Sequence, residues 1–388
     1  MSLRQILTTI IALFCVVLFF IFHSNIELPV WLEWLGPLTL AASVSFTLVQ
    51  PLSLLAAKMG LVDTPNARKI HEGAIPLVGG IAIYAGFLAV NFHYGYHLQD
   101  ERILGLMIAL GPLLLIGVLD DLWELPATLK LLVQLGAAAI VISAGVRITF
   151  LPEALWGNVA EIVLTGIWLI GLTNAINFLD GIDGLATSLT IVAAASFGLV
   201  AVATGQSFFL LLCAALCGAC MGFLPHNFRR RPASAFLGDS GATLLGFSLA
   251  SIAIVGDWGG DGSSAINIVI PLLVLGVPIF DTTFITITRF ADGRIRTFRE
   301  WLEYAGRDHI HHRLLKIGLS RFDTVLFLCV ISLILALSAI SLRDTSGLLF
   351  AVLSFAQGVI ILTVVGRFML FMDNRSETAR EDSNGPPE

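Results

Sequence analysis

Charged side chains are scarce in this sequence of 388 residues. Asp, Glu, Lys and Arg make up only 13 % of it, against 56 % hydrophobic residues, whereas a soluble domain has about 25 % charged residues. The chain is therefore too apolar to be a soluble domain or a disordered chain, and it lacks the basic face that a nucleic-acid-binding module requires. We expect an all-α, polytopic membrane protein that binds no nucleic acid.

Two other patterns are missing as well. The apolar runs do not alternate with polar residues, which argues against a closed β-barrel. The five cysteines all lie in apolar runs, so they do not outline a disulfide scaffold. Cys213, Cys217 and Cys220 would share one face of a helix, as a metal site requires. No histidine or carboxylate lies near them, and we favour the interpretation that they pack as small hydrophobic residues.

Long apolar runs predict about twelve transmembrane helices, since each needs roughly 20 apolar residues. The first run is not followed by a small-residue cleavage site, so we interpret it as a retained anchor. We treat residues 1–372 as one transmembrane domain and expect the polar tail 373–388 to be disordered. The runs lie near 5–23, 37–57, 77–93, 102–119, 129–146, 159–177, 184–204, 206–224, 241–256, 266–289, 322–342 and 346–371.

The distribution of Lys and Arg predicts the orientation of these helices. With the N-terminus placed in the cytoplasm, nineteen of the 22 basic residues fall on the cytoplasmic side. Only Arg102, Arg147 and Arg343 fall on the other side. Because cytoplasmic loops are enriched in Lys and Arg, we expect both termini in the cytoplasm.

Carboxylates are concentrated at the cytoplasmic ends of the predicted helices. Asp120 and Asp121 end one apolar run, where the helix dipole disfavours negative charge. Two solvated residues at a helix end are one interpretation of this pair, and a site for Mg²⁺ or phosphate is the other. Mg²⁺ is held by one or two carboxylates and completes its shell with water and phosphate oxygens.

A second polar group repeats every three residues in the segment NAINFLDGIDGLA. If this segment is helical, Asn177, Asp180 and Asp183 form one polar stripe on consecutive turns. Gly181 and Gly184 weaken the helix and allow a close approach of the backbone. A capped helix end is the structural alternative, but three polar residues in register favour a functional site.

Two further clusters lie on the same predicted side. Asp239 follows a glycine in FLGDSGATLLGF and precedes an apolar run, which is typical of a phosphate or metal site at a helix N-terminus but also of a simple N-cap. The segment DHIHH contains His309, His311 and His312, which are suited to contact phosphate. A zinc site and a solvated histidine cluster are the alternatives.

The loop 58–76 contains Arg68, Lys69 and His71. The general enrichment of cytoplasmic loops in basic residues explains Arg68 and Lys69. Placed beside the carboxylates, these residues would instead clamp a diphosphate. Acidic and basic clusters from distant parts of the chain thus predict one shared site at the cytoplasmic boundary of the membrane.

Five segments occur in an order that resembles the polyprenyl-phosphate N-acetylhexosamine-1-phosphate transferases, with the bacterial undecaprenyl-phosphate GlcNAc-1-phosphate transferases as the most similar group. The resemblance covers about residues 37–372. It rests on the segments PNARKIHEGAIPLVGGIAIY, LDDLWEL, NAINFLDGIDGLA, FLGDSGATLLGF and DHIHH.

The resemblance implies an enzyme of the bacterial inner membrane that transfers N-acetylhexosamine 1-phosphate from a UDP-sugar to undecaprenyl phosphate and releases UMP. This would be the first membrane step of cell wall or lipopolysaccharide biogenesis. Mg²⁺ is the implied cofactor, with Mn²⁺ as an alternative, and a homodimer stays an open question.

The same resemblance implies roles for individual residues. Asp120 and Asp121 would be catalytic and handle the lipid phosphate, with Asp120 as our choice of general base. The metal ligands would come from Asp239, Asp121 and Asp183. The substrate-binding residues would be Asn177, Asp180, Asp183, Phe236, Arg68, Lys69, His71, His309, His311 and His312, with Phe236 stacked on the uracil.

Two departures from the family pattern narrow the expectation. The muramyl-pentapeptide branch has three consecutive histidines, whereas Ile310 interrupts them here, and the segment IPLVGG replaces a TPTMGG-like string. We therefore do not expect a muramyl-pentapeptide substrate. The run near 5–23 is extra to the eleven-helix plan of the family, and it places the N-terminus inside.

Two other classes of membrane protein deserve comparison. A lipid or sugar transporter or flippase would have polar sites near the membrane midplane and repeated halves, whereas these carboxylates lie at helix ends and we find no repeat. An intramembrane aspartyl protease would need two Asp facing each other at depth. We therefore favour the transferase, with the transporter as the alternative.

Overall fold

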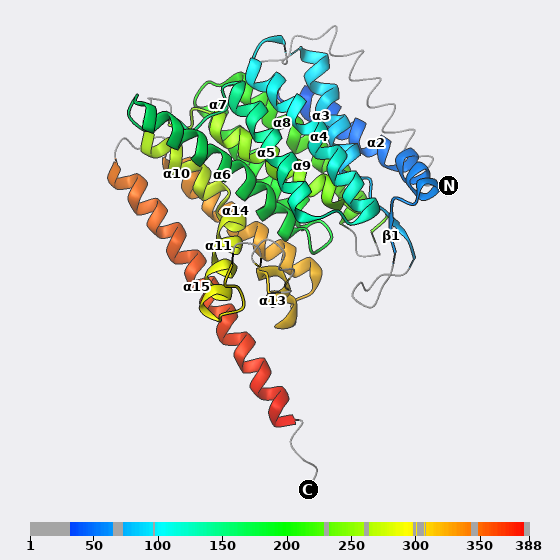
Figure 1. Cartoon of the computed structure of the whole chain (residues 1–388), viewed down its shortest axis with the longest axis vertical. Helices are drawn as coiled ribbons and strands as arrows, with labels where there is room; N and C mark the ends of the chain where they lie inside the picture. Colours follow the sequence, from blue (N-terminus) through cyan, green and yellow to red (C-terminus); the bar gives the residue numbers. More distant parts are fainter. Residues whose placement is uncertain are drawn as a thin grey trace.

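The structure is a computed structural model of the chain. It describes residues 32–64, 73–95, 98–228, 233–259, 264–297, 300, 306, 308–342 and 348–383. Most of this part of the chain is helical (Figure 1). The helices are α2 (Leu35–Met59), α3 (Gly79–Tyr94), α4 (Glu101–Trp123), α5 (Ala127–Ser143), α6 (Leu155–Leu179), α7 (Leu185–Ala203), α8 (Ser207–Asn227), α9 (Gly238–Val255), α10 (Ser264–Val274), α11 (Gly276–Ala291), α13 (Ile310–Lys316), α14 (Arg321–Leu342) and α15 (Leu348–Ser383).

The prediction of an all-α polytopic membrane protein is confirmed. Within the described ranges, eight helices are long and apolar enough to cross a membrane. The run expected as one helix near 266–289 is a bent pair instead, because α10 and α11 meet at an angle of 78°. The first expected helix, near 5–23, lies outside the described residues, so the count of twelve stays a prediction.

Helix α9 forms the centre of the bundle and packs against α3, α4, α6 and α7. Small residues let its neighbours approach closely, as is typical of helix packing in membranes. A Cβ at Gly117 of α4 would lie 2.6 Å from the backbone nitrogen of Ser240, and a Cβ at Gly246 would lie 2.7 Å from Cα of Thr173 on α6. Helix α15, by contrast, runs along the edge of the bundle (Figure 1) and exposes most of its apolar side chains.

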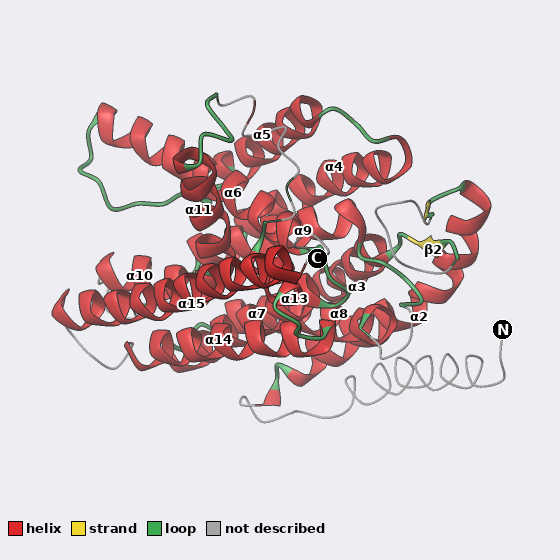
Figure 2. Ribbon diagram, turned by 90° about the horizontal axis from the view of Figure 1, so that it is seen from below, coloured by secondary structure: helices red, strands yellow, loops and turns green. Residues whose placement is uncertain are grey.

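The tight packing of α9 brings several helix ends to one end of the bundle. Helix α4 ends and α9 begins there, joined by hydrogen bonds from the backbone of Asp239 and Ser240 to Asp121. Helix α13 lies over the middle of the bundle when it is viewed from below (Figure 2). The fold therefore gathers at one end the segments in which the sequence concentrates its carboxylates and histidines.

Two short strands between α2 and α3 connect to the segment that leads into α9. Strands β1 (Val62–Asp63) and β2 (Ile75–Pro76) pair antiparallel, with Val62 opposite Pro76. The carbonyl of Pro76 accepts a hydrogen bond from the backbone N–H of Phe236 at 2.8 Å. The carbonyl of Phe236 in turn accepts one from Gly79 at 3.0 Å. These hydrogen bonds thus hold the start of α3 beside the start of α9.

Two boundaries differ from those expected. Helix α6 ends at Leu179, and Asp180 follows it in a turn, so Asn177, Asp180 and Asp183 do not form one helical stripe. The glycine-rich sequence after Leu179 explains this end, and Gly184 adopts a positive φ of 80° before α7. Helix α15 continues beyond Met372 to Ser383, into the segment 373–388 that we expected to be disordered.

Candidate active site

Asp120, Lys130 and Asp239 form the charged centre of the site. The Lys130 ammonium lies 2.7 Å from Oδ2 of Asp120 and 3.3 Å from Oδ2 of Asp239. The two carboxyl groups also contact each other. Asp120 is almost fully buried, whereas the side chain of Asp239 is 41 % exposed. One cation thus faces two carboxylates, and the exposed edge belongs to Asp239.

The turn between α4 and α5 explains how Lys130 reaches Asp120. Oδ1 of Asp120 accepts a hydrogen bond from the backbone N–H of Leu125 at 2.7 Å, which closes the turn. Glu124 takes a left-handed φ of 50° and Pro126 precedes the first residue of α5. Helix α5 therefore starts beside the end of α4, and its first turn returns Lys130 to the carboxylate. Lys130 was not among the predicted site residues, because a basic residue at a cytoplasmic helix end is explained by membrane orientation alone.

Asp121 has a different environment from Asp120. Its Oδ1 accepts the backbone N–H of Asp239 at 2.9 Å, and its Oδ2 accepts that of Ser240 at 3.4 Å. These are the first backbone donors of α9, which lack partners within the helix. Gly238 is required here, because it has a φ of 74° and a Cβ would lie 2.6 Å from Oδ2 of Asp121. Asp121 therefore caps α9 and fixes where Asp239 points.

Asp180 lies directly after the end of α6, close to Asp239 and Asp121. Burial raises the pKa of its carboxyl well above the ordinary value, and the negative charges of Asp239, Asp183 and Asp121 raise it further. Asp180 is therefore close enough to each of these three carboxylates to be repelled by it. Asp183 lies at the margin, where its Oδ2 is 3.6 Å from Nη1 of Arg321.

The histidine segment packs directly against the turn that contains Asp180. His311 is fully buried, and its ring lies 4.2 Å from that of His312 at a tilt of 48°. Its ring contacts Gly181 so closely that a Cβ at that position would be 3.0 Å from Cε1 and closer still to Nε2. Burial lowers the pKa of His311 well below its ordinary value, and His312 and His309 lower it further. His311 is therefore a neutral ring that fills space beside Asp180.

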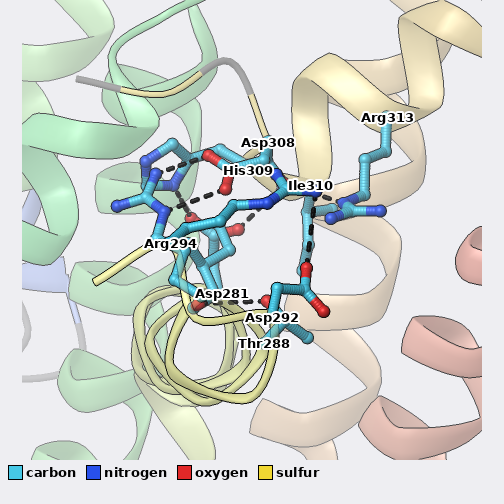
Figure 3. A network of polar contacts seen from close by, with 10 residues as sticks. Asp281, Thr288, Asp292, Arg294, Asp308, His309, Ile310 and Arg313 are labelled. Atoms are coloured by element: carbon cyan, nitrogen blue, oxygen red, sulfur yellow. Dashed lines mark hydrogen bonds and ion pairs between the residues drawn. The ribbon is translucent and has the colours of Figure 1, made fainter. Parts of the chain in front are cut away.

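His309 contacts residues of both α6 and α11. Its ring is 5.3 Å from that of Phe178, the residue after Asn177. Its Nδ1 lies 2.7 Å from Oδ2 of Asp281 on α11 (Figure 3). Asp281 was not among the predicted site residues, although a carboxylate within an apolar run is itself a signal of function.

The remaining predicted residues divide into two groups. Phe236 is partly buried between the hairpin and the start of α9, three residues before Asp239. Arg68, Lys69 and His71 lie outside the described residues. The structure thus brings together the aspartates, the histidines and the Phe236 segment, and the placement of the basic loop stays a prediction.

The donor set fits Mg²⁺ better than zinc. In the part of the chain that the structure describes, no three His, Cys, Asp or Glu side chains are grouped as a complete protein metal site. Structural and catalytic zinc sites need three or four such ligands. Mg²⁺ needs only one or two carboxylates when substrate phosphates and water supply the rest. Asp239, with its exposed edge, and its neighbour Asp120 meet that requirement.

Comparison with known proteins places the chain in a family. The sequence profile of glycosyl transferase family 4 matches residues 103–257, which include Asp120, Asp180 and Asp239. A probable undecaprenyl-phosphate N-acetylglucosaminyl 1-phosphate transferase of Bacillus subtilis is 35 % identical over 75 % of this chain and 80 % of the relative.

Two further relatives are more distant in sequence. A decaprenyl-phosphate N-acetylglucosaminephosphotransferase of Mycobacterium tuberculosis is 28 % identical over 84 % of this chain and 88 % of its own length. An undecaprenyl-phosphate α-N-acetylglucosaminyl 1-phosphate transferase of Escherichia coli is 28 % identical over 73 % of this chain and 76 % of its own length. The chain therefore belongs to glycosyl transferase family 4, the family of polyprenyl-phosphate N-acetylhexosamine-1-phosphate transferases that its sequence motifs indicated.

Proposed function

We propose that this protein transfers N-acetylglucosamine 1-phosphate from UDP-N-acetylglucosamine to undecaprenyl phosphate and releases UMP. The names of the relatives support the polyprenyl-phosphate acceptor and the GlcNAc phosphate group. An activated sugar phosphate must bring its own leaving group, and the family resemblance implies that this group is UMP. The enzyme would act in the bacterial inner membrane, with both termini in the cytoplasm, at the first membrane step of a cell-surface polysaccharide.

The observation that supports this proposal is the convergence of Asp120, Lys130 and Asp239 at the end of a membrane bundle. An oxygen of the lipid phosphate would attack the β-phosphorus of the donor. The new bond joins that oxygen to phosphorus, and the bond to the α-phosphate oxygen breaks to release UMP. Both reactants are anions, so positioning and charge compensation are the main contributions of the protein.

The residues divide these tasks according to their surroundings. Lys130 already lies at the centre of the site, between the two carboxylates. Its ammonium would turn toward the phosphates when the substrates bind. Asp120 would keep the lipid phosphate fully ionised. Asp239 would hold Mg²⁺, with Asp121 fixing its position through the first backbone donors of α9. When bound, Mg²⁺ supplies charge compensation for the diphosphate and the leaving UMP.

The location of the site suits the two substrates. The lipid tail must stay in the bilayer while its phosphate meets a donor that is soluble in the cytoplasm. A site at helix ends satisfies both needs, since α4 and α9 are apolar over most of their length and polar at this end. Phe236 would stack on the uracil, and His309 and His312 would face the diphosphate or the sugar, whereas the buried His311 would support them.

The test is a reaction with the purified, full-length protein in detergent. Undecaprenyl phosphate, Mg²⁺ and a panel of UDP-sugars are supplied, and both UMP and lipid-linked product are measured. We expect both products in equal amounts with UDP-N-acetylglucosamine. Absence of UMP with every UDP-sugar would overturn the proposal. Movement of labelled lipid across liposome bilayers without any UMP would favour the transporter alternative.

A further inference from the structure

Asp281 is a carboxylate fully buried in the bent membrane helix pair of α10 and α11. Ionisable residues in such positions are rare because their desolvation is costly, and each is expected to have a partner and a function. Oδ2 of Asp281 lies 2.7 Å from Nδ1 of His309, and Oδ1 accepts the backbone N–H of Ile310 at 2.8 Å. Both oxygens thus face the start of α13.

We propose that Asp281 is a positioning residue that fixes the His309 ring, so that Nε2 is the nitrogen presented to the donor diphosphate. This inference rests on the proposed function, because it assigns His309 to the substrate of that reaction. It goes further by naming the ring nitrogen that is used and the buried group that selects it.

The contact with Asp281 determines which ring nitrogen of His309 stays available to the substrate. An ionised carboxylate only accepts hydrogen bonds, so Nδ1 of His309 carries a proton and donates it to Asp281. Nε2 has no hydrogen-bond partner among the residues that the structure describes. A diphosphate oxygen also only accepts hydrogen bonds, so Nε2 contacts it as an N–H, with the ring as an imidazolium whose other N–H is held and oriented by Asp281.

The neighbourhood of His309 agrees with a role toward the site. The ring lies 5.3 Å from Phe178, next to Asn177 on α6, and stacks at 6.0 Å on His311, which contacts Gly181. The fixed ring therefore borders the end of α6, where Asp180 begins the acidic side of the site.

A second contact holds the same segment from α11. The guanidinium of Arg289 pairs with Asp308, with its Nε 2.8 Å from Oδ2. Although burial disfavours the charged carboxylate, Arg289 holds the pKa of Asp308 below its ordinary value. Figure 3 shows Asp308, His309 and Ile310 in a row above Asp281. Helix α11 thus anchors the backbone through Arg289 and Asp281, and it supplies the hydrogen bond to the imidazole through Asp281.

The variant Asp281→Asn removes this function with little change of shape. Asn has one acceptor oxygen and an amide that donates, so the His309 Nδ1 proton and the Ile310 N–H are no longer both accepted. Removal of such a supporting contact typically reduces activity about 10–100-fold. We expect a reduction of this size in kcat/KM, measured as UMP release. Asp292→Asn, at the exposed end of the same helix, is the matched control and keeps activity within about twofold.

A double-mutant cycle separates positioning from general loss of structure. If Asp281 acts through His309, Asp281→Asn in the His309→Ala background causes no further loss beyond about twofold. If Asp281 only stabilises the fold, the two losses multiply, and the proposal is overturned.

A second variant tests the choice of nitrogen and keeps the proposal decidable if Asp281→Asn does not fold. His309→Asn places an amide near Nδ1, which keeps the contact with Asp281 and removes Nε2. We expect the thermal stability of the unmodified protein but the low turnover of His309→Ala. Normal turnover in His309→Asn contradicts the inference. Absence of turnover in the unmodified protein would instead contradict the proposed function, so the two failures are distinguishable.

Discussion

The variant Gly181→Ala tests the contact between the Asp180 turn and the histidine segment. Its new Cβ would be 3.0 Å from Cε1 and 3.2 Å from Cδ2 of His311, and closer still to Nε2. These distances are well inside normal van der Waals contact. The His311 ring is fully buried, stacked on His309 and in tilted contact with His312, so a shift away from the new methyl group would disturb these contacts.

The expected cost follows from this overpacking. An extra methyl group in a packed core destabilises by about 1–3 kcal/mol. We expect Gly181→Ala to lower the midpoint of thermal unfolding in detergent and to reduce UMP release, because the turn also positions Asp180. Gly171→Ala on α6 is the control, since a Cβ there meets nothing within 4 Å. It should stabilise the helix by up to about 1 kcal/mol.

Two further results test whether the loss in Gly181→Ala comes from the contact of its methyl group with His311. Adding His311→Ala to Gly181→Ala makes room for the methyl group, so stability should recover in part even where turnover does not. If Gly181→Ala and Gly171→Ala have the same stability and the same turnover, the close contact between the turn and His311 is not part of the native structure.

Three other perturbations address different parts of the site. Lys130→Met leaves the Asp120 and Asp239 carboxyls in contact without their cation, so turnover should fall by at least about tenfold. Lys130→Arg keeps the charge and should retain part of the turnover. Equal turnover in both variants would contradict the role of the charge. Removal of divalent ions with EDTA should abolish UMP release, and Mg²⁺ should restore it with Mn²⁺ as the weaker substitute; full activity in EDTA would exclude the ion from the reaction. His311 binds fewer protons folded than unfolded, because burial lowers its pKa below the ordinary 6.5, so stability should fall as the pH drops below about 6.5. His311→Leu should flatten this dependence, and an unchanged slope would assign the effect to other groups.

The sequence predicted the helices and the polar clusters because these depend on local signals. The run near 37–57 became α2 at Leu35–Met59, and the carboxylates lie at helix ends as their flanking apolar residues indicated. The bend between α10 and α11 was missed, although Pro271 and Gly276 lie close to it. Both residues weaken a helix, but apolar composition alone does not tell a bent helix from a straight one.

Contacts between distant segments were beyond a single sequence. Lys130 and Asp239 are 109 residues apart in the sequence. Their contact depends on the packing of α4 against both α5 and α9. Asp281 reaches His309 from α11, which follows the bend, and lies 28 residues before the histidine in the sequence. Asp281 had a usable signal, since it interrupts the apolar segment VPIFDTTF. Lys130 had none, because a basic residue at a cytoplasmic helix end is common.

The most direct test of the account is a titration of Mn²⁺, in place of Mg²⁺, followed by electron paramagnetic resonance in the presence of UDP-N-acetylglucosamine. The unmodified protein should bind Mn²⁺ in a donor-dependent way. Asp239→Asn should lose both this binding and UMP release, while Asp292→Asn retains them. If Asp239→Asn binds Mn²⁺ and turns over like the unmodified protein, the carboxylate centre around Lys130 is not where the metal and the diphosphate meet.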